Sequence, residues 1–341
     1  HYTSPTVIRG IYEAIGRMGF TTGNILEPAC GVGNFFGMLP DHMSGSRLYG
    51  VELDSISGRI AKQLYPNADI TVAGFETTDR RNFYDLAIGN VPFGNYLVDD
   101  KSYNSLGFRI HNYFLAKALD QVRPGGVVAF VTSRYTMDSK STEVRKYLAQ
   151  RAELLGAIRL PNNAFLANAG TSVVSDILFL QKRQRMVDIE PEWAHLDKTA
   201  DGITLNRYFV QHSEMVLGEL STESTQYGKE ECTVRPIPGA VLSQQLHEAV
   251  QHICGTYVEV VMDEAQDEQE DSIPADPNVK NYSFTVVDGT VYYRENSRMH
   301  PAQLSETAAQ RVRGLIGLRD CVRSLITLET EDRPEPEIEA K

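Results

Sequence analysis

The segment Glu-Pro-Ala-Cys-Gly-Val-Gly-Asn-Phe, at residues 27–35, follows a short apolar run and opens a helical pattern. Its two glycines let the backbone pass close to a ligand, and the start of the helix offers unpaired N–H groups. It is not a dinucleotide-binding turn, because Phe36 stands where the third glycine of Gly-x-Gly-x-x-Gly belongs. Glu27 would repel a pyrophosphate. It suits a ligand with a positive end, such as the ammonium and sulfonium of S-adenosylmethionine.

A second acidic segment, Val-Glu-Leu-Asp at residues 51–54, ends the next apolar run. An acid roughly 20 residues after the glycine turn typically binds the ribose hydroxyls of a nucleoside ligand. We assign that role to Glu52, with Leu53 beside it. Asp54 precedes Ser55 and is predicted to cap a helix instead.

A third segment, Asp-Leu-Ala-Ile-Gly-Asn-Val-Pro-Phe-Gly at residues 85–94, ends the fourth apolar run. Together, residues 27–35, 51–54 and 90–93 resemble motifs I, II and IV of amino-methyltransferases. Motif IV is usually (Asn/Asp/Ser)-Pro-Pro-(Tyr/Phe), and this chain has Val91 in place of the first proline. The resemblance implies S-adenosylmethionine as cofactor and an amino group as methyl acceptor.

Motif IV assigns catalysis to Asn90, Val91, Pro92 and Phe93. An adenine amino group is a poor nucleophile, because its lone pair is delocalised into the ring. The Asn90 oxygen and a neighbouring main-chain carbonyl can accept its two hydrogen bonds, which frees the lone pair for direct in-line attack. Phe93 would stack on a base flipped out of the duplex. Val91 keeps the carbonyl but loses the rigidity of proline. The alternative is a plain strand-end turn with a buried phenylalanine.

Two further segments complete the expected cofactor site. Residues 1–5, His-Tyr-Thr-Ser-Pro, resemble motif X despite the extra Ser4, and motif X precedes motif I in the gamma group of N6-adenine DNA methyltransferases. By the same resemblance Phe75 packs on the cofactor adenine, while Gly74 replaces an acid whose role is absent or passes to Glu76. The full set of predicted cofactor residues is Tyr2, Thr3, Glu27, Ala29, Cys30, Gly31, Gly33, Asn34, Phe35, Glu52, Leu53, Phe75, Glu76 and Asn90.

Residues 111–114 resemble motif V, which borders the cofactor pocket, although the helical spacing of Phe114 fits ordinary core better. His111 receives no catalytic role, because no proton need leave the amine before attack. Residues 154–182 resemble the end of the catalytic domain in modification subunits of type I restriction systems. Phe165 lies where motif VIII would support the target base, with packing of a surface loop as an equal alternative.

The elements that must position these residues alternate between strands and helices. Strands are predicted at residues 24–27, 47–52, 69–72, 84–89, 127–132, 154–159 and 176–180, and helices at 6–18, 34–39, 55–64, 110–122 and 142–150. Residues 123–126, Arg-Pro-Gly-Gly, are predicted to form a turn. The pattern predicts an α/β fold over residues 1–183: a doubly wound, mostly parallel, seven-stranded Rossmann-like sheet.

The rest of the chain is expected to be a smaller mixed α+β region. We expect an extension at residues 184–258 that packs on or follows the sheet, and an acidic flexible linker at 259–279. A β-hairpin and an amphipathic helix follow at 280–341. This part resembles, faintly, the segment that joins methylase to helicase domains in proteins of phages and conjugative elements. We therefore expect a piece of a larger protein, which begins here at His1, with a fused or separate helicase or specificity component as partner.

Charge divides the chain in the same place. Its net charge is −12, but residues 1–183 carry 19 basic and 16 acidic side chains, whereas residues 184–341 carry 14 and 29. The first part therefore meets double-stranded DNA without a large penalty. The four cysteines form no Cys-x-x-Cys pair, so no metal site is expected. No apolar run suits a membrane span and no signal peptide opens the chain, so we expect a cytoplasmic protein.

Other functions compete with methylation of DNA adenine. The same motif IV serves amino-methyltransferases that act on RNA or on protein glutamine. Because Val91 and Gly74 depart from the pattern, a catalytically weak or inactive module that binds cofactor or DNA is a second alternative. Cytosine-C5 methylation is disfavoured, since its cysteine nucleophile is absent from motif IV, and Asn90 favours adenine over cytosine-N4.

Overall fold

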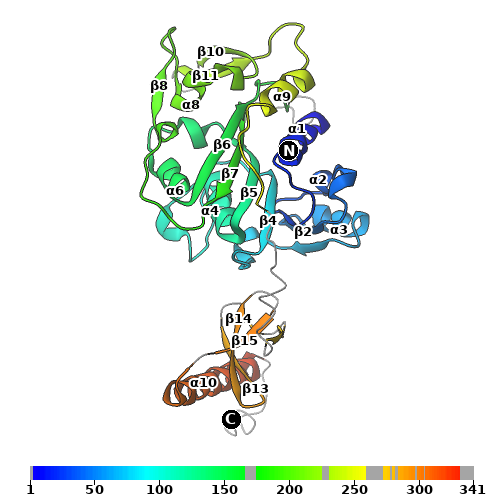
Figure 1. Cartoon of the computed structure of the whole chain (residues 1–341), viewed down its shortest axis with the longest axis vertical. Coiled ribbons are helices and arrows are strands. Elements are labelled where there is room, and N and C mark those ends of the chain that lie inside the picture. The colour runs from blue at the N-terminus through cyan, green and yellow to red at the C-terminus, as the bar shows by residue number, and fades with distance from the viewer. Residues whose placement is uncertain are drawn as a thin grey trace. The chain divides into compact units, whose positions relative to one another are not determined.

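The structure, a computed structural model, describes residues 3–165, 174–224, 230–258, 272–276, 279–280, 283–295, 298–302 and 304–330. The chain divides into two compact units, residues 1–259 and 260–341 (Figure 1). Tyr2 and most of the segment expected to be an acidic linker lie outside the described residues.

A seven-stranded sheet in the order β3-β2-β1-β4-β5-β7-β6 forms the centre of the first unit. Only β7 runs antiparallel to the others. This confirms the predicted α/β fold with a doubly wound, mostly parallel sheet. Because β2, β1 and β4 are parallel neighbours, the residues that follow them meet at one edge of the sheet. The strands are β1 Asn24–Glu27, β2 Arg47–Glu52, β3 Asp69–Val72, β4 Tyr84–Asn90, β5 Val122–Ser133, β6 Ala152–Arg159 and β7 Ser175–Lys182.

The turn predicted at residues 123–126 is wrong, because these residues belong to β5, which begins at Val122. The pairing of β4 with β5 shifts between Tyr84 and Leu86, so a bulge absorbs the Pro-Gly-Gly sequence. Gly125 supplies the left-handed conformation there, with φ of 79°. Arg123 anchors the bulge through a hydrogen bond of 2.6 Å from its Nε to Asp85 Oδ1.

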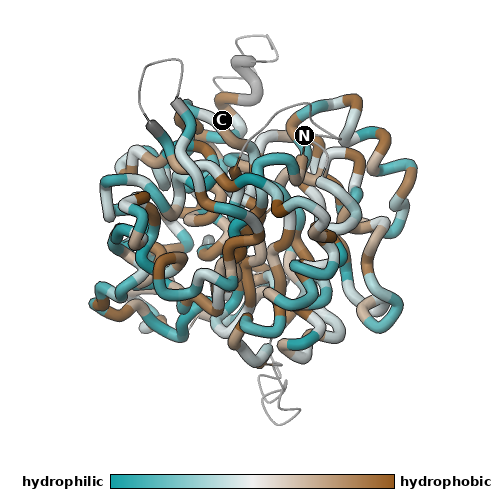
Figure 2. Tube along the Cα trace, turned by 90° about the horizontal axis from the view of Figure 1, so that it is seen from above, coloured by the Kyte–Doolittle hydropathy of each residue, from teal (hydrophilic) through white to brown (hydrophobic). Residues whose placement is uncertain are grey.

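Helices cover both faces of the sheet, and two of them, α1 and α3, begin at a side-chain cap. Ser4 caps α1, with Pro5 at its first position, and Asp54 caps α3 as predicted, accepting a hydrogen bond of 2.7 Å from Ser57 N. Hydrophobic segments run through the middle of this body and hydrophilic ones lie mostly at its periphery (Figure 2). The helices are α1 Pro5–Arg17, α2 Asn34–Gly37, α3 Ser55–Leu64, α4 Ile110–Gln121, α5 Tyr135–Asp138 and α6 Glu143–Arg151.

Residues 184–258 pack on the same body. Leu246 is buried between α9 and α1, and Tyr257 places its ring 4.9 Å from that of Phe20. The buried Arg159 binds Asp138 and Asp176 at 2.7 and 2.8 Å, and its carbonyl accepts from Leu217 N. The elements here are β8 Leu196–Lys198, β9 Thr204–Asn206, α8 Arg207–Gln211, β10 Glu219–Ser224, β11 Glu230–Arg235 and α9 Leu242–Val250.

The second unit is a small antiparallel sheet with one long helix. Its strands are β12 Ile273–Pro274, β13 Phe284–Val287, β14 Thr290–Glu295 and β15 Arg298–Pro301, and its helix is α10 Glu306–Thr330. Asp288 and Gly289 join β13 to β14 with φ of 48° and 80°, as a tight hairpin turn requires. Within the described residues, no helix is long and apolar enough to cross a membrane.

Candidate active site

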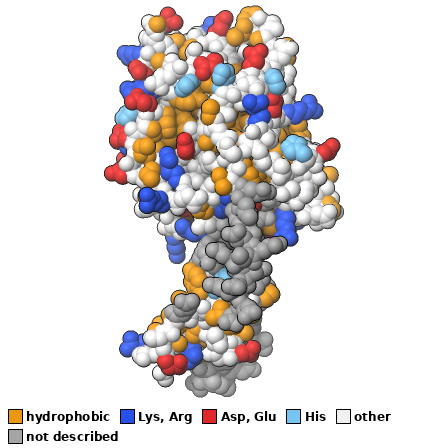
Figure 3. Space-filling view, viewed as in Figure 1, with side chains coloured by type: hydrophobic (Ala, Val, Ile, Leu, Met, Phe, Trp, Pro, Cys, Tyr) orange, Lys and Arg blue, Asp and Glu red, His pale blue; other side chains and the backbone are white. Residues whose placement is uncertain are grey.

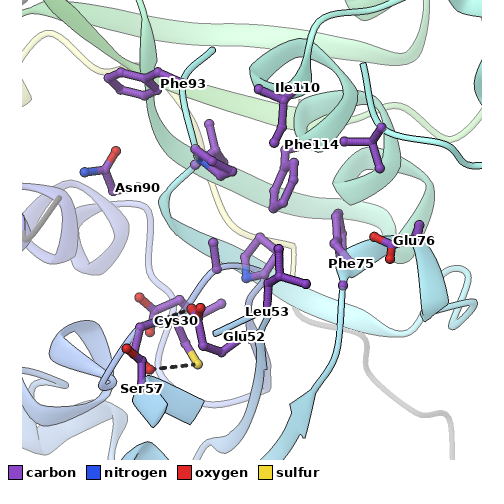
Figure 4. Close-up of a pocket in the computed structure, with 18 of the residues that line it drawn as sticks. Cys30, Glu52, Leu53, Ser57, Phe75, Glu76, Asn90, Phe93, Ile110 and Phe114 are labelled. Atoms are coloured by element: carbon purple, nitrogen blue, oxygen red, sulfur yellow. Dashed lines mark hydrogen bonds between the residues drawn. The ribbon is translucent and has the colours of Figure 1, made fainter. Parts of the chain in front are cut away.

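A cavity of about 850 Å³ opens where β1, β2 and β4 end (Figure 4). Every predicted site residue lines it except Gly33 and Tyr2, and Tyr2 lies outside the described residues. The residues that the sheet brings together are Thr3, Glu27, Ala29, Cys30, Gly31, Asn34, Phe35, Glu52, Leu53, Phe75, Glu76, Asn90, Val91, Pro92 and Phe93. Ligands of open α/β sheets bind at this edge.

Glu27 is the most unusual charge in the cavity. Its side chain is 3% exposed, and its Oε2 atom has no hydrogen-bond partner among the described residues. Burial, together with the negative charge of Glu52, raises the pKa of the Glu27 carboxyl well above its ordinary value. A buried acid without a partner calls for a cation or a strong donor from a ligand.

Glu52 links the first two motifs. Its Oε2 accepts a hydrogen bond of 2.7 Å from Gly31 N, and its Oε1 accepts one of 2.8 Å from Asp54 N. The carboxylate is thereby held at the end of β2, facing the glycine turn (Figure 4). Two main-chain donors leave it further lone pairs for the hydroxyl groups of a ligand.

Gly33 shapes the turn without lining the cavity. It has φ of 87° and stands directly before α2. A Cβ atom at this position would overlap the ring of Tyr65. The residue is therefore required for the close approach of the turn to α3 and the segment that follows it.

Phe75 and Glu76, which follow β3, form another wall of the cavity. The Phe75 ring lies 4.8 Å from that of Phe114, and the Glu76 carbonyl accepts a hydrogen bond of 3.1 Å from Lys117 Nζ. Lys117 is held in turn by a buried ion pair of 2.7 Å with Asp100. A Cβ atom added at Gly74 would overlap the Glu76 carboxylate. The Glu76 carboxylate thus occupies the space into which an acidic side chain at position 74 would project.

The turn after β4 lines the cavity next to the end of β1. Asn90 ends the strand, and no described residue makes a hydrogen bond with its side chain. Val91 is buried, and its N–H donates a hydrogen bond of 3.1 Å to the Val131 carbonyl. A proline at position 91 could not donate this bond. Val91 therefore extends the β4–β5 ladder in place of the usual proline.

A match with a family model decides the classification. The model of the N-6 DNA methylases matches residues 1–193, more than half of the chain. The chain belongs to the N-6 DNA methylase family. The resemblance drawn from motifs I, II and IV is thereby confirmed.

Relatives of this N-6 DNA methylase come from viruses and bacteria. Defense against restriction protein B of Escherichia phage P1 is 34% identical over 192 residues, which are 53% of this chain and 8% of that protein. Type II methyltransferase M.CvrRI of Paramecium bursaria Chlorella virus XZ-6E is 29% identical over 188 residues, 53% of this chain and 48% of that one. The chain thus spans less than half the length of either relative.

Among solved structures, a modification subunit of a putative type I restriction enzyme from Vibrio vulnificus YJ016 is similar. It has a TM-score of 0.46 and 17% identity, over 69% of this chain and 58% of that one.

The cavity of this N-6 DNA methylase also contains residues that the sequence did not assign to it. Phe114, which its spacing placed in ordinary core, both packs on Phe75 and lines the cavity. Phe165, for which two roles were left open, lines it as well. The others come from the predicted motif segments and the residues beside them, from α3, from the loop between β4 and α4, and from the start of α4: Pro28, Val32, Ser57, Ala73, Gly74, Tyr96, Leu97, Val98, Asp99 and Ile110.

The conformation of Gly33 leads to a stability prediction. We expect Gly33→Ala to lower the free energy of unfolding by about 2–3 kcal/mol, because alanine is strained at this φ and its methyl meets the Tyr65 ring. Chemical denaturation measures this change. Gly19→Ala is the matched control, since Gly19 also has a positive φ but nothing within 4 Å of the added Cβ. Equal losses in the two variants would contradict a role for the Tyr65 contact.

The hydrogen bond of Val91 leads to a second stability prediction. We expect Val91→Pro to lower the free energy of unfolding by about 1–2 kcal/mol, although it restores the usual motif, because the Val131 carbonyl loses its donor. Val91→Ala keeps the N–H and measures the contribution of the side chain alone. If Val91→Pro were as stable as the wild type, the extended ladder would not contribute to stability.

Proposed function

We propose that this N-6 DNA methylase transfers a methyl group from S-adenosylmethionine to the exocyclic N6 amino group of adenine in DNA. The observation that carries the proposal is a single cavity lined by two acids, the buried Glu27 and the fixed Glu52, and by the Asn90 side chain, which makes no hydrogen bond with a described residue. The two acids have the chemistry to hold a cationic nucleoside. Asn90 can hold a planar amine beside it.

The acids and rings fit S-adenosylmethionine. Glu27 would face its positively charged groups, and Glu52 would accept from its ribose hydroxyls. Phe75 and Leu53 would enclose its adenine, and Glu76 would accept from the adenine amino group in place of an acid at position 74. Thr3, the glycine turn and Asn34 would close the site around the methionine part. When bound, this cofactor supplies a methyl on a sulfonium, whose carbon–sulfur bond breaks as the carbon–nitrogen bond forms.

The motif IV turn would prepare the acceptor. The Asn90 Oδ1 atom and the Val91 carbonyl accept the two hydrogen bonds of the adenine amino group, and the nitrogen becomes more tetrahedral. Phe93 stacks on the flipped base, and Phe165 supports it from the side. This turn needs no general base before attack, because the amine loses its proton to water after the new bond has formed. Positioning and electrostatics carry the catalysis.

We also propose a partner component for this chain. The chain spans 8% of the phage P1 relative and 48% of the virus methyltransferase. We propose that it acts in the cytoplasm, with a fused or separate helicase or specificity component. On the face of the first unit seen in Figure 3, Lys and Arg side chains are interspersed with Asp and Glu. That face carries no continuous basic field, so a separate component that holds the DNA duplex is consistent with it.

The substrate class can be tested with labelled methyl transfer. The chain is incubated with tritiated S-adenosylmethionine and, in parallel, with double-stranded DNA, RNA and protein. We expect label in DNA alone. Transfer to RNA or protein would support the other amino-methyltransferase functions. Binding of S-adenosylmethionine without transfer to any of the three would support a non-catalytic module.

A further inference from the structure

A second cavity, of about 500 Å³, adjoins the first and shares Phe93 with it. Its walls come from the loop after β4, the start of α4, the junction of β5 and α5, and the β10–β11 hairpin. Its size is in the range of small-ligand pockets. None of the predicted site residues except Phe93 belongs to it.

Two of the four charged side chains that line this cavity, Arg134 and Glu231, neutralise each other. Arg134 forms an ion pair with Glu231 and lies 3.9 Å from Asp138, while the Tyr135 hydroxyl donates to the same Glu231. Glu223 lies directly opposite Glu231 in the β10–β11 ladder. Arg109 is the other basic side chain of the lining, and it is exposed and makes no ion pair or hydrogen bond with a described residue. Its backbone is nevertheless fixed by pairing with Leu97.

His111 is a buried polar residue in the wall of the second cavity. It is 2% exposed, and neither ring nitrogen has a hydrogen-bond partner among the described residues. Burial, and the nearby charge of Arg109, lower the pKa of His111 to about 4. The imidazole is therefore neutral at physiological pH and offers one donor and one acceptor. Buried polar groups are normally satisfied, so an unpaired pair of nitrogens at a cavity wall indicates a missing partner.

We propose that this second cavity binds the nucleobase next to the target adenine on the same DNA strand, with His111 as a specificity-determining residue. The inference rests on the proposed function. Phe93 separates the two cavities, as an aromatic ring between two consecutive bases would. The neutral imidazole matches the donor and acceptor pattern of a base edge. Arg109, the cation without a counter-ion in the cavity wall, binds the phosphate of the same nucleotide.

The first test is His111→Leu. A leucine of similar volume removes two unpaired buried nitrogens, so the melting temperature should stay the same or rise. At a site that the wild type methylates, the base on each side of the adenine is changed to all four bases. We expect the wild type to discriminate among them by about tenfold or more on one side, and His111→Leu to discriminate by less than about threefold. A lower melting temperature with unchanged discrimination would mean a structural role and would overturn the proposal.

The second test is Arg109→Ala, with Lys101→Ala as control. Lys101 is an exposed basic residue of the same loop that lines neither cavity. Binding is measured by anisotropy of fluorescein-labelled DNA strands, which requires no methyl transfer. We expect Arg109→Ala to weaken DNA binding by about tenfold, whatever the flanking base. The slope of the logarithm of affinity against the logarithm of salt concentration should become shallower by about one. Lys101→Ala should change neither quantity.

The two readouts separate the two claims. If the wild type methylates DNA and both variants keep its affinity and its flanking-base preference, the second cavity is not a nucleotide site while the proposed function stands. If no DNA is methylated but Arg109→Ala still weakens DNA binding and Lys101→Ala does not, the assignment of the cavity to a nucleotide stands and the methylation proposal fails. Absence of DNA binding by the wild type would overturn both.

Discussion

Asn90→Ala is expected to lower the rate of methyl transfer by about 10²–10³-fold. The side-chain oxygen of Asn90 is one of two acceptors proposed to reshape the adenine amino group, and loss of one preorganised hydrogen-bonding group in an active site has an effect of this size. The Asn90 side chain forms no hydrogen bond with a described residue, so its removal should leave the fold intact. Single-turnover transfer of labelled methyl to DNA measures the rate.

Two matched variants make this result specific. Asn90→Asp keeps an oxygen acceptor and should retain activity to within about tenfold of the wild type. We expect this because the slow rate of Asn90→Ala comes from the lost hydrogen-bond acceptor and not from the changed shape of the side chain. Asn67→Ala removes an exposed asparagine outside both cavities and should be fully active. Equal rates for Asn90→Ala and Asn67→Ala would contradict the assignment of Asn90 to the reaction.

Glu27→Gln is expected to weaken S-adenosylmethionine binding by about 100-fold. Glu27 Oε2 has no hydrogen-bond partner among the described residues, and the variant removes the negative charge that the carboxyl would carry against a bound cation; charge-assisted hydrogen bonds contribute about 1.5–3 kcal/mol. Isothermal calorimetry measures the dissociation constant. Glu153→Gln changes an exposed carboxylate on β6 and is the matched control. Unchanged affinity in Glu27→Gln would show that the cofactor does not use this acid.

The pH dependence gives the same residue an independent signature. Because the pKa of Glu27 is raised by burial and by Glu52, the free protein holds a proton there that a cationic ligand must displace. Between pH 5 and the raised pKa, affinity should therefore increase with pH, by up to about tenfold per unit. The stability of the ligand-free protein should depend on pH in the opposite direction. The contribution of Glu27 to the free energy of unfolding is fully present below the ordinary pKa of a glutamate and is lost as the pH rises through the raised pKa. Glu27→Gln should show neither dependence.

The sheet could be predicted in detail where short-range pattern decides it. The bounds of β1, β2 and β3 agree with the predicted ones residue for residue, because each is a short apolar run ended by a turn or a motif. Asp54 and Glu52 could be told apart for a similar reason: one precedes a helix and the other ends a strand. The start of β5 could not be predicted, since its Pro-Gly-Gly sequence favours a turn locally and contacts with residues distant in the sequence, such as those of Arg123 with Asp85 and Tyr257, hold it in the ladder.

The residues of the site also divide into those that local sequence predicts and those that long-range packing places. The predicted residues come from strand ends, which a parallel sheet necessarily gathers at one edge. The missed residues Tyr96, Leu97 and Val98 belong to a loop that folds back on itself, with Ile110 N donating to the Tyr96 carbonyl at 3.0 Å. Glu76 was one of two options for the missing acid, and only the backbone geometry shows its carboxylate in front of Gly74. Such placements depend on long-range packing, which a motif does not contain.

The identity of the methylated atom tests the central claim most directly. Double-stranded DNA is incubated with the chain and S-adenosylmethionine that carries a deuterated methyl group, then digested to nucleosides and analysed by mass spectrometry. The account predicts deuterated N6-methyladenine from the wild type, and a loss of about 10²-fold or more of this product with Asn90→Ala. Deuterated methyl on cytosine, or no labelled nucleoside at all from a wild-type chain that binds the cofactor, would contradict it.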